Sequence, residues 1–72
     1  MGTKKEPGKW DCYAKAEPDE PVFILLGRDA SAPARVRKWA YERELLGNDD
    51  PEKIAEARRV ADDMERWRRE HR

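Results

Sequence analysis

The sequence predicts an all-α protein that folds as one compact three-helix domain. Apolar residues recur at helical spacing over two long stretches, and a capping residue and a proline stand at the start of each stretch. The chain has 72 residues, enough for one domain that buries only about 60% of its unfolded surface. We expect the three helices to span residues 19–27, 31–46 and 50–71.

The start of the chain is expected to lie outside this domain. Residues 1–9 are polar and contain the helix breakers Pro7 and Gly8, which predicts a flexible, disordered arm. The single small helical domain then covers residues 10–72. Residues 10–14 would open it as either a short helical turn or a short strand.

The first expected helix, over residues 19–27, has two readings. Asp19 can cap it, Pro21 is tolerated in a first turn, and Gly27 can end it in the left-handed conformation. Its apolar centre, residues 22–26, would then plug the open side of a hairpin formed by the other two helices. The same run also suits a strand, and the alternative is an α+β fold with a short ribbon from residues 10–14 and 22–26.

The second helix, over residues 31–46, has clearer boundaries. Ser31 can serve as its N-cap, and Gly47 with Asn48 ends it. The turn after Gly47 is short, so the second and third helices are expected to form an antiparallel hairpin.

The third helix, over residues 50–71, has the strongest signals. Asp50 supplies the N-cap and Pro51 the first helical position. One apolar stripe contains Ile54, Ala57, Val60, Ala61, Met64 and Trp67. Oppositely charged residues four apart, such as Arg58 and Asp62, predict ion pairs along another side of the helix. At 1.5 Å per residue this helix would be roughly 30 Å long, so its last turns are expected to project beyond the core.

Charge and composition restrict the possible partners and locations. The 16 basic and 16 acidic side chains cancel, unlike those of a strongly basic nucleic-acid-binding domain or an acidic DNA mimic. Cys12 is the only cysteine, so the chain cannot form an internal disulfide, as is usual in a reducing compartment. Residues 22–26 are the longest apolar run and are too short to cross a bilayer, and no signal peptide is evident. We therefore expect a cytoplasmic protein without a membrane partner.

No catalytic, cofactor-binding or metal-binding set is evident in the sequence. Cys12 and His71 are too few for a structural zinc site, and a dyad of the two would depend on the last residues of the chain. Ser31 is better explained as an N-cap than as a nucleophile. Acidic pairs such as Asp62 and Asp63 have arginine neighbours, and nothing near them would raise a carboxyl pKa as acid–base catalysis requires. The sequence thus predicts a protein that is not an enzyme and needs no cofactor or metal.

Two surfaces are candidates for binding another molecule. Trp67 near the end of the third helix is flanked by Arg66 and Arg69, a composition typical of protein–protein interfaces. This predicts docking to an unidentified protein, or a homodimer along the third helix. The alternative is an accessory protein that contacts nucleic acid through arginines and a lysine of the second and third helices: Arg35, Arg37, Lys38, Arg68 and Arg72.

The order of residues also resembles a group of proteins. The pattern is Asp19-Glu20-Pro21-x-Phe23-x-Leu25, Arg28-Asp29, Ala32-Pro33, Val36-Arg37-x-Trp39-Ala40 and Ala57 to Ala61-Asp62-x-Met64-Glu65-x-Trp67. It covers residues 10–67 and is similar to short uncharacterised proteins of bacterial and phage-like genomes. The resemblance implies a small accessory protein, such as one carried by a mobile genetic element, and implies no activity and no functional residues.

Overall fold

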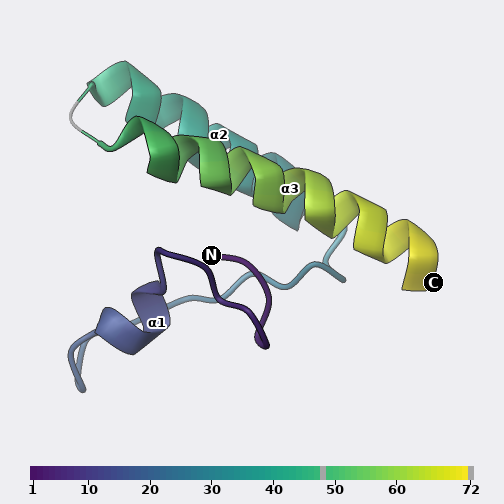
Figure 1. The fold of residues 1–72 in the computed structure, drawn as a ribbon, viewed down its shortest axis with the longest axis horizontal. Coiled ribbons are helices and arrows are strands. Elements are labelled where there is room, and N and C mark those ends of the chain that lie inside the picture. Colours follow the sequence, from purple (N-terminus) through teal and green to yellow (C-terminus); the bar gives the residue numbers. More distant parts are fainter. Residues whose placement is uncertain (48, 72) are drawn as a thin grey trace.

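Two long helices form an antiparallel hairpin, and the N-terminal part of the chain forms a second, mostly irregular layer below it (Figure 1). The structure is a computed structural model that describes residues 1–47 and 49–71. The hairpin consists of α2 (Ala32–Leu46) and α3 (Pro51–His71). The lower layer contains one short helix, α1 (Cys12–Lys15), and is otherwise extended or turned. The predicted all-α, three-helix fold is confirmed, with one helix in an unexpected place.

Helix α3 begins as the sequence predicts. The Asp50 carboxylate accepts a hydrogen bond from the Glu52 backbone N–H at 2.9 Å, and Pro51 occupies the first helical position. Glu52 places a negative charge in the first turn, where the positive end of the helix dipole stabilises it. Basic residues fill the last turn, where the opposite end of the dipole stabilises them. The expected helix over residues 50–71 is therefore confirmed.

Ser31 and Gly47 flank α2 as the sequence predicts, but the Ser31 side chain makes no cap hydrogen bond. Ser31 has a helical backbone conformation (φ −86°, ψ −13°), whereas an N-cap is normally extended, and its side chain makes no cap hydrogen bond. Instead its hydroxyl and its backbone N–H donate to the Asp29 carboxylate at 2.8 and 2.9 Å. Ser31 thus occupies the predicted N-cap position, but the prediction that its side chain caps the helix is wrong. Gly47 ends the helix in the left-handed conformation (φ 73°), as predicted, and its N–H donates to the Arg43 carbonyl; Asn48 lies outside the described residues.

The helix expected over residues 19–27 is absent, and α1 lies earlier in the chain. Residues 17–20 form a turn in which the Glu20 N–H donates to the Glu17 carbonyl at 3.1 Å. Pro21 disfavours a helical conformation at Glu20, but the same order at Ala32-Pro33 opens α2, so the proline alone does not prevent a helix. Gly27 does not have a positive φ and instead belongs to a turn in which the Asp29 N–H donates to the Leu26 carbonyl at 3.0 Å. Too few residues remain between the two turns to nucleate a helix.

Residues 22–26 are extended, and they do not plug the hairpin as expected. Val22, Phe23, Ile24 and Leu26 are each at least half exposed, and Phe23 reaches 87%. Only Leu25 is half-buried. The alternative ribbon is also wrong, because residues 12–15 are helical and no strand occurs in the described ranges 1–47 and 49–71. Asp11 caps this short helix by accepting from the Ala14 N–H at 3.2 Å, which removes the partner that a strand at 22–26 would need.

The core between α2 and α3 is made mostly of small side chains. Ala40, Ala57 and Ala61 have no exposed surface, and Ile54 is the largest buried side chain in the part of the chain that the structure describes. Half-buried Met1, Val36 and Trp39 pack against this cluster. Because alanine side chains are short, the two helix backbones can approach closely along this seam.

Residues 1–9 lie against α3. The terminal amine of Met1 donates to the Trp10 carbonyl and lies 3.8 Å from a Glu56 carboxylate oxygen. The Lys9 ammonium lies over the Trp10 ring at 4.9 Å and pairs with Glu52 at 3.5 Å. These contacts hold the arm along the lower side of the hairpin; its flexibility stays a prediction.

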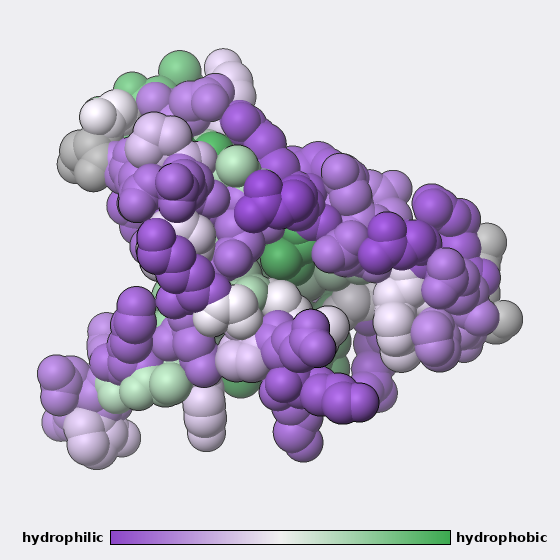
Figure 2. Space-filling model, in the orientation of Figure 1, coloured by the Kyte–Doolittle hydropathy of each residue, from purple (hydrophilic) through white to green (hydrophobic). Residues whose placement is uncertain are grey.

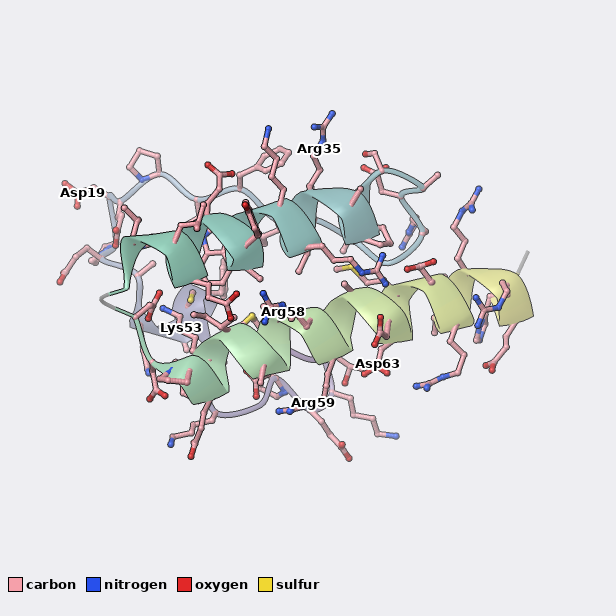
Figure 3. All side chains as sticks on the ribbon, turned by 90° about the horizontal axis from the view of Figure 1, so that it is seen from above. Asp19, Arg35, Lys53, Arg58, Arg59 and Asp63 are labelled. Carbon is pink, nitrogen blue, oxygen red and sulfur yellow. The ribbon has the colours of Figure 1, made fainter. Side chains whose placement is uncertain are left out.

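Ion pairs join the two helices of the hairpin. Arg58 donates to both carboxylate oxygens of Glu44 at 3.2 Å, instead of pairing with Asp62 along α3 as predicted. Asp62 accepts from Arg37 of α2 at 2.7 Å, and Glu65 also pairs with Arg37. In Figure 3 Arg58 lies toward α2, whereas Arg59 points to the opposite side of α3. The charges therefore help to fix the register of α2 against α3.

The close packing of the hairpin can be tested at Ala57. We expect Ala57→Leu to lower the free energy of unfolding by about 1–3 kcal/mol, because the added carbon atoms have no space between the helices. The control Ala34→Leu, at an exposed position of α2, should change it by less than about 0.5 kcal/mol. Urea unfolding followed by circular dichroism measures both. An Ala57→Leu protein as stable as the wild type would contradict the close approach.

Candidate interaction surface

The C-terminal half of α3 forms the floor of a groove. Val60, Met64 and Trp67 follow one another at helical spacing on the side of α3 that faces the N-terminal layer. Residues 2–6 and residues 25–28 form the walls, and the groove has a volume of about 620 Å³. Figure 2 shows hydrophobic atoms in the hollow between the hairpin and the lower layer, on a face that is otherwise mostly hydrophilic. The segment from Val60 to Trp67 is referred to below as the groove floor.

Gly27 lies at the point where one wall of this groove approaches α3 closely. A Cβ atom at Gly27 would lie 3.5 Å from the Met64 side chain and 3.6 Å from its Cα atom. The backbone of residues 25–28 therefore lies almost directly on α3. This contact fixes where the extended apolar segment crosses the helix.

Trp67 lies in the groove and is 46% exposed. Its ring stacks on the ring of His71, with centroids 4.1 Å apart and planes 9° from parallel. The His71 Nδ1 atom lies 2.9 Å from the Trp67 carbonyl oxygen, which holds the imidazole in place over the indole. One face of the indole is thus covered by a neighbour on the same helix, while part of the side chain remains available to another molecule.

Arg66 and Arg69 line different hollows of the surface. Arg66 lines the groove with Trp67, and its guanidinium pairs with Asp63 at 2.9 Å. Arg69 lines a separate hollow with Arg37, Glu65 and Arg68. The structure therefore places Trp67 and Arg66 in one groove and Arg69 in another hollow.

Two of the alternative basic residues, Arg37 and Arg68, meet at the open end of the hairpin, where acidic residues accompany them. Arg37 and Arg68 line one hollow because the antiparallel arrangement places the start of α2 beside the end of α3. The guanidinium of Arg37 is bound to Asp62 and Glu65, which raise its pKa through hydrogen bonds and charge. Arg35 points away from α3 in Figure 3.

Lys38 and Arg72, the other two residues of this basic set, do not enlarge the cluster at the open end of the hairpin. Lys38 is exposed on α2 and has no ion pair among the described residues, and Arg72 lies outside those residues. Asp29 lies close enough to Arg35 and Arg68 to respond to their charge. The structure thus gathers the arginines at one end of the molecule and interleaves them with carboxylates.

The Asp29 carboxylate at this end accepts two hydrogen bonds from Ser31. Its pKa is lowered chiefly by the hydrogen bond from the Ser31 backbone N–H, then by the one from the Ser31 hydroxyl. The charges of Arg35 and Arg68 lower it further. These hydrogen bonds connect the turn at residues 26–29 to the start of α2, so Asp29 positions the end of the extended segment.

The groups considered for catalysis or metal binding lie apart. Cys12 is exposed in α1, and His71 is in the last turn of α3, at the other end of the molecule (Figure 1). Within residues 1–47 and 49–71, no three or more His, Cys, Asp or Glu residues cluster so that they could hold a metal ion. None of the helices described is long and apolar enough to span a membrane.

Sequence reasoning missed the exposed segment of residues 22–26 as part of a site. The signal that could have found it is its composition, because Val22, Phe23 and Ile24 are of the β-branched and aromatic types that favour extended backbone. An extended apolar run between two turns has no helical face with which to enter a core.

The role of Asp29 predicts a pH-dependent stability. A carboxyl group whose pKa is lowered by folding stabilises the protein above its ordinary pKa, near pH 4, and this contribution is lost as the pH falls through the lowered value. We therefore expect Asp29→Asn to reduce the free energy of unfolding at pH 7 and to have a smaller effect at pH 3. Ser31→Ala keeps the backbone donor and should retain part of the effect. Urea titrations at the two pH values measure it, and an equal loss at both would contradict this role.

Comparison of the chain with protein-family models, with curated proteins and with solved structures gives no match. The resemblance to short bacterial and phage-like proteins stays a prediction. The function is therefore inferred from the residues of the chain itself.

Proposed function

We propose that the protein is a small, non-enzymatic protein-interaction module that docks through the groove floor around Trp67 and Arg66. One observation carries this proposal: the chain exposes more large hydrophobic side chains than it buries. Nine of them are exposed, and none is fully buried among the described residues. Soluble monomers rarely leave extensive contiguous apolar surface in water, and such surface usually marks an interaction site.

The exposed hydrophobic residues are not scattered at random. Four of them lie within residues 22–26. Residues 25–28, which form one wall of the groove, line it together with Trp67. Tryptophan and arginine are the residues that most often dominate binding energy at interfaces. Trp67 with its neighbour Arg66 therefore gives the groove both an apolar anchor and a charged edge.

The groove suits a protein segment better than a small molecule. Small-molecule sites combine an enclosed apolar cavity with a few convergent polar groups. The groove is only partly enclosed, and no polar or charged residue is fully buried in the part of the chain that the structure describes. An apolar side chain carried on an extended segment or a helix could contact the groove floor while the charged residues of the lining stay at its edge.

Nucleic-acid contact through the arginines is the second candidate. The hollow lined by Arg37, Arg68 and Arg69 supports it, but Glu65 lies in the same hollow and Arg37 is already paired. A phosphate backbone would meet carboxylates as well as arginines there. We therefore rank this function below protein docking.

The docking surface can be tested with two matched substitutions. Trp67→Ala is expected to weaken binding to a protein captured from extract of the native host by at least about 2 kcal/mol, or roughly thirtyfold, as for an interface hot spot. Tyr41→Ala removes an aromatic side chain that is similarly exposed but lies outside the groove, and should leave binding unchanged. Circular dichroism confirms that both variants fold. Unchanged binding by folded Trp67→Ala would exclude this surface.

Salt dependence distinguishes nucleic-acid binding from protein docking. Contacts to phosphate weaken steeply as salt rises, because binding releases counterions. We expect no binding of a labelled random DNA duplex at low or moderate salt. Binding at low salt that is lost in Arg68→Gln and retained in Trp67→Ala would favour the nucleic-acid function instead.

A further inference from the structure

Residues 22–26 form an extended segment whose backbone is not protected by hydrogen bonds. Among the described residues, no backbone N–H or carbonyl group of residues 22–25 takes part in a hydrogen bond. Phe23 has the most exposed of the large hydrophobic side chains, at 87%, and Ile24 after it is 59% exposed. The peptide bond between Phe23 and Ile24 can therefore be reached from solvent without unfolding a helix.

This segment already has the backbone conformation in which endoproteases bind their substrates. These enzymes hold a substrate as an added β-strand, through backbone hydrogen bonds on both sides of the bond that is cut. No described residue bonds to the N–H or carbonyl of Phe23 or to the N–H of Leu25, so these groups are free to bind an enzyme. A hydrophobic specificity pocket, as in chymotrypsin, would take the Phe23 side chain.

The turns on either side of the segment present it and can widen at little cost. Before it, the Glu20 N–H donates to the Glu17 carbonyl at 3.1 Å, and after it the Asp29 N–H donates to the Leu26 carbonyl at 3.0 Å. One hydrogen bond of this kind adds little net stability, because water replaces it when it breaks. A protease that needs a longer extended stretch can therefore open either turn.

The other exposed large hydrophobic side chains all lie in helices. They are Tyr13 in α1, Tyr41, Leu45 and Leu46 in α2, and Trp67 in α3. A helix must unwind before an enzyme can hold it as a strand, so cleavage there is limited by the fraction of locally unfolded chain. Exposure alone thus does not select the site. The combination of exposure with extended backbone selects residues 22–26.

Few contacts would hold residues 1–23 to the hairpin once this segment is cut. Helix α1 packs against neither α2 nor α3 and lies in the lower layer (Figure 1). The main attachments are Met1, which packs against the core and pairs with Glu56, and the exposed pair of Lys9 with Glu52. Exposed pairs contribute little stability, whereas the intact chain keeps the two layers at a high effective concentration.

We propose that the Phe23–Ile24 bond is a site of limited proteolysis by an endoprotease that accepts a large aromatic side chain, and that the cut releases residues 1–23. Water is the second reactant. Its oxygen bonds to the Phe23 carbonyl carbon as the C–N bond breaks, and its two protons pass to the Ile24 nitrogen, which leaves a carboxylate and an ammonium group.

Release of residues 1–23 would also change the groove. Residues 2–6 form one of its walls, so their departure leaves the groove floor open on that side. This effect on docking rests on the proposed function, whereas the cleavage and the release do not depend on it.

Limited digestion with chymotrypsin tests the position of the cut. At a low ratio of protease to protein, mass spectrometry should show residues 1–23 and 24–72 as the first products. We expect the bond after Tyr41, which is exposed but helical, to be cut at least about a hundredfold more slowly. A first cut at any other bond would overturn the proposal.

Phe23→Ser and Tyr41→Ser are matched variants for the same assay. Phe23→Ser removes the side chain that fills the protease pocket, and should slow the loss of full-length chain at least about tenfold. Because this side chain is exposed, the variant should fold like the wild type, which circular dichroism checks. Tyr41→Ser should be digested at the wild-type rate. Equal rates for Phe23→Ser and the wild type would show that Phe23 does not direct the cut.

Size-exclusion chromatography of the cut protein tests the release. Without denaturant, residues 1–23 should elute separately from residues 24–72, and co-elution of the two fragments would overturn the release. The two proposals fail in distinguishable ways. If the first cut lies elsewhere but Trp67→Ala abolishes capture of another protein, only the cleavage site is overturned. If the cut and the release occur but Trp67→Ala leaves binding unchanged, only the docking function is overturned.

Discussion

The close contact of α2 and α3 through alanine side chains is the constraint on which the rest of the structure depends. Ala40, Ala57 and Ala61 let the helices approach closely, but each buries little apolar area and thus contributes little to stability. The larger side chains, such as Trp39 and Val36, lie at the edge of the seam and not at its centre. The hairpin therefore needs the N-terminal layer as a cover, and this cover is too irregular to bury all of its own apolar residues. The groove beside Trp67 is the result.

Electrostatics shape the surface more than they stabilise the fold. The pairs of Arg58 with Glu44 and of Arg37 with Asp62 are exposed, and such pairs usually add little stability. They do connect specific residues of α2 to specific residues of α3, which disfavours a shifted register. They also occupy cations that would otherwise be available to phosphate groups. The opposite charges of this neutral protein thus also neutralise one another locally. The exposed apolar surfaces are therefore better candidates for recognition than the charged ones.

The sequence was sufficient where structure depends on neighbours along the chain. The Asp50-Pro51 start of α3, the glycine at the end of α2 and the apolar stripe of α3 all act within a turn or two, and each prediction is confirmed. It failed at residues 19–27, because the same order of a capping residue and a proline precedes a helix at residues 31–33 and no helix at residues 19–21, so the local pattern does not distinguish the two outcomes. Trp67 could be selected by composition alone. The groove could not, because its walls come from residues 2–6 and 25–28, and no local pattern says that these segments meet over α3.

The hairpin is built from residues adjacent in sequence, whereas the extended segment of residues 22–26 depends on α3, which is synthesised last. As the chain leaves the ribosome, this apolar segment emerges before the helix that supports it exists. Short, extended, apolar segments of this kind are prone to aggregate while they wait for their partner. The acidic turn before it and the Arg28-Asp29 pair after it are charges of the sort that flank and isolate such segments. The residues that border the apolar run thus protect the nascent chain as well as ending the apolar segment.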